Sequence, residues 1–249
     1  DATSITPNLI ADTLNEADGI ETNVARGYHA IEFLLWGQDL YGTEAGAGDR
    51  PWTDYAQGGD CTNGNCERRG AYLDAVSDLL VSDLQWMVDQ WKPGVEGNYR
   101  AELTGMAPSA VYQKMLFGMG SLSLGELAGE RMKVALAAHS PEDEHDCFSD
   151  NTHFSHFYNG KGIENVYLGE YQRVNGETLS GPSLSELVAA SEPQLDQALK
   201  TDLDASEAAL QTLVDSATKG VHFDQLIAPG NADGAATVNH AIDALVVQT

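Results

Sequence analysis

The sequence GYHAIEFLLW, residues 27–36, decides how the rest of the chain is interpreted, because it places His29 and Glu32 three positions apart. If the segment is helical, residues three apart lie about 60° apart around the axis, so both side chains point the same way. An imidazole and a carboxylate on one face suit a metal ion or a shared proton, although such pairs also occur by chance in ordinary helices. Gly27, which has no side chain, would let a second helix approach.

The residues before this motif predict an early start for its helix. Asp18 and Glu21, three positions apart, have the spacing of a capping box. Apolar residues recur at helical spacing and would form a separate buried stripe: Ile20, Val24, Ile31 and Leu35. We therefore expect one helix from about Asp18 through the histidine and glutamate.

Further motifs follow in a fixed order along the chain. They are GYHAIEFLLWGQDL (27–40), RPWTDY (50–55), CERRGAYL (66–73), GELAGERM (125–132) and DCFSDNTH (146–153). Together they resemble the imelysin-like family, specifically its iron-regulated branch. The likeness runs from about Ser4 to near the C-terminus, and five ordered motifs are far more specific than one tetrapeptide.

This resemblance implies an all-α protein made of helical bundles, with two four-helix-bundle domains in the full-length protein. Family members are exported across the inner membrane and linked to iron uptake, and the name-giving member was described as a peptidase. The expected location is therefore periplasmic or outer-membrane-associated, with the signal segment outside this chain. The expected partners are a metal ion or an iron-containing ligand and other envelope components of iron uptake.

Members of this family usually carry roughly a hundred residues ahead of the G-x-H-x-x-E helix. We therefore expect this chain to be a fragment, on which the missing N-terminal segment or another chain packs. The expected domains are residues 1–139, a bundle that carries the histidine–glutamate helix, and residues 140–249, part of a second bundle.

The charge of the chain argues against several classes of partner. It carries 38 acidic and 13 basic residues, a formal net charge of −25. Nucleic acids and anionic membrane surfaces need a basic footprint, so we expect neither as a partner. No run of 18 apolar residues occurs that would span a bilayer.

Cys61 and Cys66 bracket TNGN, a turn-prone sequence that could bring the two thiols together. In an oxidising compartment we expect a disulfide between them. The alternative, a two-cysteine metal clip, lacks a second pair of ligands. Cys147 would then remain as a buried thiol.

The rest of the pattern predicts helices and polar connections. We expect helices from Pro7 to about Asn15, over 67–91, over 108–138, from about Asp150 with an interruption at Gly160–Gly162, and as amphipathic segments over 183–249. Residues 42–64 are expected to form a long loop, and the acidic run PEDEHD (141–146) is expected to be an exposed loop. No strand pattern is evident.

The helix over 108–138 contains four glycines, which predict close helix contact or a kink beside a site. Glu126 and Glu130 lie one turn apart and would repel each other unless paired. Arg131 is interpreted either as the centre of an ion-pair network or as a site residue.

These elements lead to a hypothesis about metal binding. The D-x-x-H spacing of Asp150 and His153 mirrors the spacing of His29 and Glu32, and imidazole with carboxylate suits iron or zinc. The expected ligands, which would meet in one cleft, are His29, Glu32, Glu126, Asp150 and His153. The further site candidates are Gly27, Arg69 and Arg131. His222 and His240 are interpreted as structural.

Two alternatives stay open from the sequence. A metallopeptidase of the zincin type needs H-E-x-x-H, but residues 30 and 33 are alanine and phenylalanine, so catalytic residues are unknown and enzymatic activity is undecided. The second alternative is a helical module that binds a peptide or protein and uses His29 and Glu32 as hydrogen-bonding groups without a metal.

Overall fold

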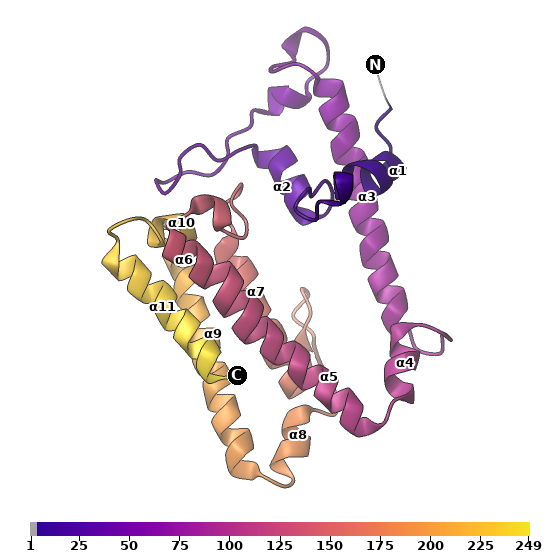
Figure 1. Cartoon of the computed structure of the whole chain (residues 1–249), viewed down its shortest axis with the longest axis vertical. Coiled ribbons are helices and arrows are strands. Elements are labelled where there is room, and N and C mark those ends of the chain that lie inside the picture. The colour runs from indigo at the N-terminus through magenta and orange to yellow at the C-terminus, as the bar shows by residue number, and fades with distance from the viewer. Residues whose placement is uncertain (1–3) are drawn as a thin grey trace. The chain divides into compact units, whose positions relative to one another are not determined.

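The computed structural model describes residues 4–249 and is mostly helical (Figure 1). Contacts divide the chain into two compact units: unit 1 is Asp1–Leu40 with Ala47–Tyr112, and unit 2 is Tyr41–Gly46 with Gln113–Thr249. The prediction of a helical protein is confirmed, apart from one small hairpin. The division into bundles at residue 139 and the pair of four-helix bundles remain predictions.

Unit 1 is built on the 26-residue helix α3 (Cys66–Trp91), against which α1 (Pro7–Leu9), η1 (Ile10–Leu14) and α2 (Tyr28–Trp36) pack. Its small core surrounds the buried residues Ile10, Ala75 and Val76. The shorter elements are η2 (Ala17–Gly19), η3 (Trp52–Tyr55), η4 (Gly58–Asp60) and α4 (Tyr99–Gly105).

The predicted early start of the histidine helix is wrong. α2 begins only at Tyr28, and the residue before it, Gly27, has a φ of +87° that helical backbone does not adopt. Asp18 also lies in the left-handed region, with a φ of 60°, so no capping box forms there. Ile20 and Val24 are exposed rather than part of a buried stripe. A capping-box spacing therefore cannot start a helix when positive-φ residues interrupt the backbone that follows.

The segment between α2 and α3 is irregular but well bonded around the carboxylate of Asp54, which is 1% exposed. Arg50, Thr62 and Asn63 donate hydrogen bonds to it at 3.0, 2.7 and 2.8 Å. Burial alone would raise the pKa of Asp54, but these hydrogen bonds outweigh burial and hold the pKa below its usual range.

The predicted disulfide between Cys61 and Cys66 is confirmed, and it closes the turn immediately before α3. One turn into α3, Arg69 donates hydrogen bonds to the backbone carbonyls of Asp54 and Gly64. Arg69 was a candidate site residue. Its contacts within unit 1 tie the loop to the helix.

Unit 2 contains four long helical segments, each packed against two others (Figure 1). η5 (Ser121–Lys133) contacts α7 (Thr152–Leu168) and α11 (Ala232–Val247), and α9 (Pro193–Thr218) contacts α7 and α11. The main core lies among η5, α6, α9, α10 and α11. The remaining helices are α5 (Pro108–Gly120), whose residues 108–112 belong to unit 1, and α6 (Val134–Ala138), η6 (Pro141–Asp143), α8 (Leu184–Ala189) and α10 (Phe223–Leu226).

The glycine-rich helix predicted over 108–138 is confirmed as a continuous run of α5, η5 and α6. Its middle, η5, is wound as a π-helix, a local irregularity that is often found near functional sites. The expected interruption at Gly160–Gly162 is wrong, because α7 runs unbroken to Leu168. At Gly160 an added Cβ would lie 2.4 Å from Leu210 Cδ1, so this glycine permits close packing of α7 on α9.

The strands that the sequence did not reveal form an antiparallel hairpin in unit 2. β1 (Glu170–Gln172) pairs with β2 (Thr178–Ser180), with Tyr171 opposite Leu179. All six residues are exposed, so the pattern of alternating burial that identifies strands is absent.

Among the described residues, no helix is both long enough and apolar enough to cross a membrane.

Candidate metal centre

In unit 1, the predicted pairing of His29 and Glu32 is confirmed. Both lie on α2, and His29 Nδ1 donates a hydrogen bond to Glu32 Oε2 at 2.9 Å. The glutamate is buried while the imidazole is partly exposed. A carboxylate that accepts from Nδ1 fixes the tautomer of a neutral imidazole, so the lone pair is on Nε2, the arrangement by which proteins orient a metal-binding histidine.

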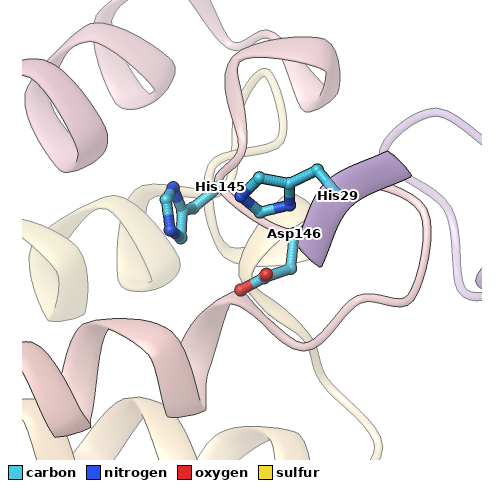
Figure 2. A group of neighbouring side chains, drawn as sticks. All are labelled: His29, His145 and Asp146. Atoms are coloured by element: carbon cyan, nitrogen blue, oxygen red, sulfur yellow. The ribbon is translucent and has the colours of Figure 1, made fainter. Parts of the chain in front are cut away.

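In unit 2, a second imidazole and carboxylate lie side by side in the segment that joins α6 to α7. One ligand atom of His145 and one of Asp146 lie within 4.8 Å of each other. Figure 2 draws these two side chains from that segment, together with His29 from α2. Within unit 2, the imidazole of His145 and the carboxylate of Asp146 are ligand types that suit a metal ion.

The backbone around His145 and Asp146 is held by Thr152, the first residue of α7. The backbone N–H of Asp146 donates to the Thr152 hydroxyl at 2.8 Å. The same hydroxyl donates to the carboxylate of Glu144. The buried Thr152 therefore holds Glu144 and Asp146, the two residues that flank His145 in the chain.

The predicted pair of Asp150 and His153 lies together in unit 2, and both residues are buried. His222 Nδ1 donates to the backbone carbonyl of Asp150 at 3.0 Å, and its ring lies 5.7 Å from that of His153. Burial, followed by the nearby His222, lowers the pKa of His153, so its imidazole is neutral at pH 7. His222, which was interpreted as structural from the sequence, therefore contacts both Asp150 and His153.

Glu144 and His156 are the most strongly perturbed groups of unit 2. Burial, together with the carboxylates of Asp224, Asp150 and Asp146, raises the pKa of Glu144 to about 9. Burial, followed by the nearby His145, lowers the pKa of His156 to about 3. Desolvation disfavours the charged form of each group, and the crowded carboxylates add repulsion. This part of unit 2 is therefore rich in acidic oxygens that a cation would stabilise.

Two of the predicted site residues bind each other. Arg131 donates to Glu126 at 2.9 Å and to Asn159 at 3.2 Å. Both glutamates of this turn, Glu126 and Glu130, are exposed. The interpretation of Arg131 as an ion-pair centre is confirmed for Glu126, and a role of Glu126 as a metal ligand remains a prediction. The convergence of all five predicted ligands also remains a prediction.

The sequence analysis missed His145 and treated PEDEHD as an exposed acidic loop. That expectation is wrong at Glu144, which is buried, and at His145 and Asp146, which are partly buried. The available signal was the position of Asp146 as the first residue of the DCFSDNTH motif, directly after this histidine.

The comparisons with known proteins agree with the motifs. The sequence model of the imelysin family, Peptidase M75, matches residues 1–249. No curated protein matches the chain.

Proposed function

Because the chain belongs to the imelysin family, we propose that it binds a metal ion, iron or zinc, and serves iron uptake in the bacterial envelope. The supporting observation is the repeated pairing of imidazole with carboxylate, His29 with Glu32 at 2.9 Å and His145 with Asp146 within 4.8 Å. Nitrogen and carboxylate oxygen ligands suit both ions. The residues that we propose as metal ligands are His29 in unit 1 and, in unit 2, His145 with Asp146, each unit taken by itself.

In this proposal Glu32 orients the ligand His29 rather than binding the ion itself. Its position on Nδ1 matches the outer carboxylate of a carboxylate–histidine–metal arrangement. Asp150, just before α7, and His153, on α7, are proposed to support His145 and Asp146 within unit 2, where His222 contacts both.

We propose a periplasmic or outer-membrane-associated location, supported by the disulfide between Cys61 and Cys66. Disulfides persist in oxidising compartments and are rare in the cytosol. Other envelope components of iron uptake are proposed as partners. We also propose that the protein is built from two four-helix bundles.

Binding is favoured here over peptide hydrolysis. A zinc peptidase needs a general base beside a metal-bound water, but the carboxylate of Glu32 already accepts the Nδ1 proton of His29. Cleavage of a denatured protein by the pure, metal-loaded chain, lost in Glu32→Gln, would instead favour the peptidase.

The metal proposal is tested by binding measurements on metal-stripped protein. We expect zinc and anaerobic ferrous ion to bind, and His145→Ala to weaken binding at least 100-fold because a direct ligand is lost. Glu32→Gln should weaken it by about 10- to 100-fold, the range for an outer carboxylate. His240→Ala, at an exposed histidine, is the matched control and should bind as wild type does. Unchanged affinity in both His145→Ala and His29→Ala would contradict the proposal.

A further inference from the structure

His156 is a buried side chain that the proposed centre does not use. It lies on α7 with 0% exposure, and neither of its ring nitrogens has a hydrogen-bond partner within residues 4–249. A neutral imidazole has one N–H donor and one lone pair, and each buried group left without a partner costs about 1–3 kcal/mol. A side chain that only filled space would avoid this cost, so a ligand for the ring nitrogens is to be expected.

Glu144 is a second buried side chain that has a polar atom without a hydrogen-bond partner in the described part of the chain. It is 5% exposed, and the atom is its Oε1. The carboxylate is bonded on its other side by the Thr152 hydroxyl. One oxygen of a buried acid is therefore available to a cation.

Ring contacts bring the two residues into one region of unit 2. The ring of His156 stacks on that of His145, with centroids 6.3 Å apart, and meets the ring of Phe223 edge-on at 5.0 Å. In the chain, Glu144 directly precedes His145, and Asp224 directly follows Phe223. Asp224 is fully buried on α10, and its charge acts on Glu144. One imidazole and two buried carboxylates thus lie in the same region of unit 2, linked through His145 and Phe223.

We propose that His156, Glu144 and Asp224 form a second metal site that lies wholly within unit 2 and binds one divalent transition-metal ion. One nitrogen and two carboxylate oxygens suit zinc, ferrous iron, manganese or cobalt. Within the described residues these three side chains do not already have ligand atoms within 4.8 Å of one another. In this proposal, binding of the ion requires the three side chains to change rotamer so that their ligand atoms converge on it.

The competing explanation is that His156 is only an aromatic packing residue. The variant His156→Phe distinguishes the packing role from the ligand role, because phenylalanine keeps a ring against Phe223 but removes both nitrogens. If packing is the whole role, the variant binds metal as wild type does and is more stable, since buried polar groups without partners are gone. If His156 is a ligand, one equivalent of metal is lost.

The experiment is equilibrium dialysis of metal-stripped protein against zinc ion, with protein-bound zinc measured by elemental analysis. We expect two equivalents in the wild type and one in His156→Phe, with at least 10-fold weaker binding of the second equivalent in Glu144→Gln. His240→Phe, at an exposed histidine, is the matched control and should retain two equivalents. Cobalt ion, whose visible absorption reports its ligands, provides a second readout on the unmutated chain: its spectrum should show two distinct sites.

The two proposals fail separately. Loss of one equivalent in His145→Ala with no loss in His156→Phe and Glu144→Gln would overturn the second site and leave the proposed function standing. Loss of one equivalent in His156→Phe with no change in His145→Ala and His29→Ala would support the second site and overturn the proposed function. Wild-type zinc content in both His156→Phe and Glu144→Gln overturns the inference.

Discussion

At the scale of single residues, the buried carboxylate of Asp196 connects three helices of unit 2. It accepts hydrogen bonds from Tyr167 on α7 at 2.9 Å, Ser185 on α8 at 2.6 Å and Lys200 on α9 at 2.8 Å. Burial and the adjacent Asp196 raise the pKa of Tyr167 to about 12, so the phenol keeps the proton that it donates. This network is structural, since none of its members is among the proposed ligands.

Tyr167→Phe is expected to destabilise the protein by about 1.5–3 kcal/mol, the range for a hydrogen bond to a charged group. The tyrosine is 0% exposed, so water cannot replace its hydroxyl. Urea unfolding measures the loss. Tyr171→Phe is the matched control, because Tyr171 is exposed on β1 and its change should stay within about 0.5 kcal/mol. Equal effects of the two variants would contradict this role.

The same hydrogen bond predicts a pH dependence. Hydrogen bonds from Lys200, Ser185 and Tyr167 lower the pKa of Asp196 in the folded state. Its stabilising effect is therefore complete above the unfolded pKa, near about 4, and is lost as the pH falls through the lower folded pKa. The stability gap between wild type and Tyr167→Phe should be constant from pH 7 to 5 and shrink in more acidic solution. A gap that widens on acidification would be inconsistent with a charged acceptor.

At the scale of elements, two glycines of α7 have opposite surroundings. A Cβ at Gly160 would meet Leu210 Cδ1 at 2.4 Å, whereas a Cβ at Gly162 would meet nothing within 4 Å. Alanine is favoured over glycine in a helix by about 0.5–1 kcal/mol. The two positions therefore separate helix propensity from packing between α7 and α9.

We expect Gly162→Ala to be more stable than wild type by about 0.5–1 kcal/mol. Gly160→Ala should be less stable by up to about 2 kcal/mol, because overpacking a buried contact outweighs the gain in propensity. Urea unfolding of both variants under one set of conditions checks the order. If both alanines stabilised the chain equally, the close contact with Leu210 would not restrict this position.

These elements also show what the sequence could predict. The pairing of His29 with Glu32 depends only on three-residue spacing in one helix, so local geometry was enough. The burial of His156 involves α10, more than sixty residues away in the chain, because its ring contacts that of Phe223. For residues 141–146, which include Glu144, the composition predicted an exposed acidic loop. An acidic run gives no signal that a helix or strand distant in the chain will bury it.

At the scale of the whole molecule, like charges dominate. The chain has 38 acidic and 13 basic residues. The ion pairs among the described residues, such as that of Arg50 with Asp54, engage only some of the acids. Repulsive pairs therefore outnumber attractive ones, and a net charge this far from zero destabilises a compact state.

Added salt should consequently stabilise the protein. Raising sodium chloride from about 0.01 to 0.15 M shortens the Debye length from about 30 to about 8 Å and screens repulsion across the surface. We expect the thermal unfolding midpoint of metal-stripped protein to rise over this range, with most of the rise at the low-salt end. Potassium chloride is the control and should act equally, because screening depends on ionic strength and not on a bound ion. A midpoint that falls with salt would mean that attractive ion pairs, such as those of Lys161 with Glu164 and Glu207, outweigh the net repulsion.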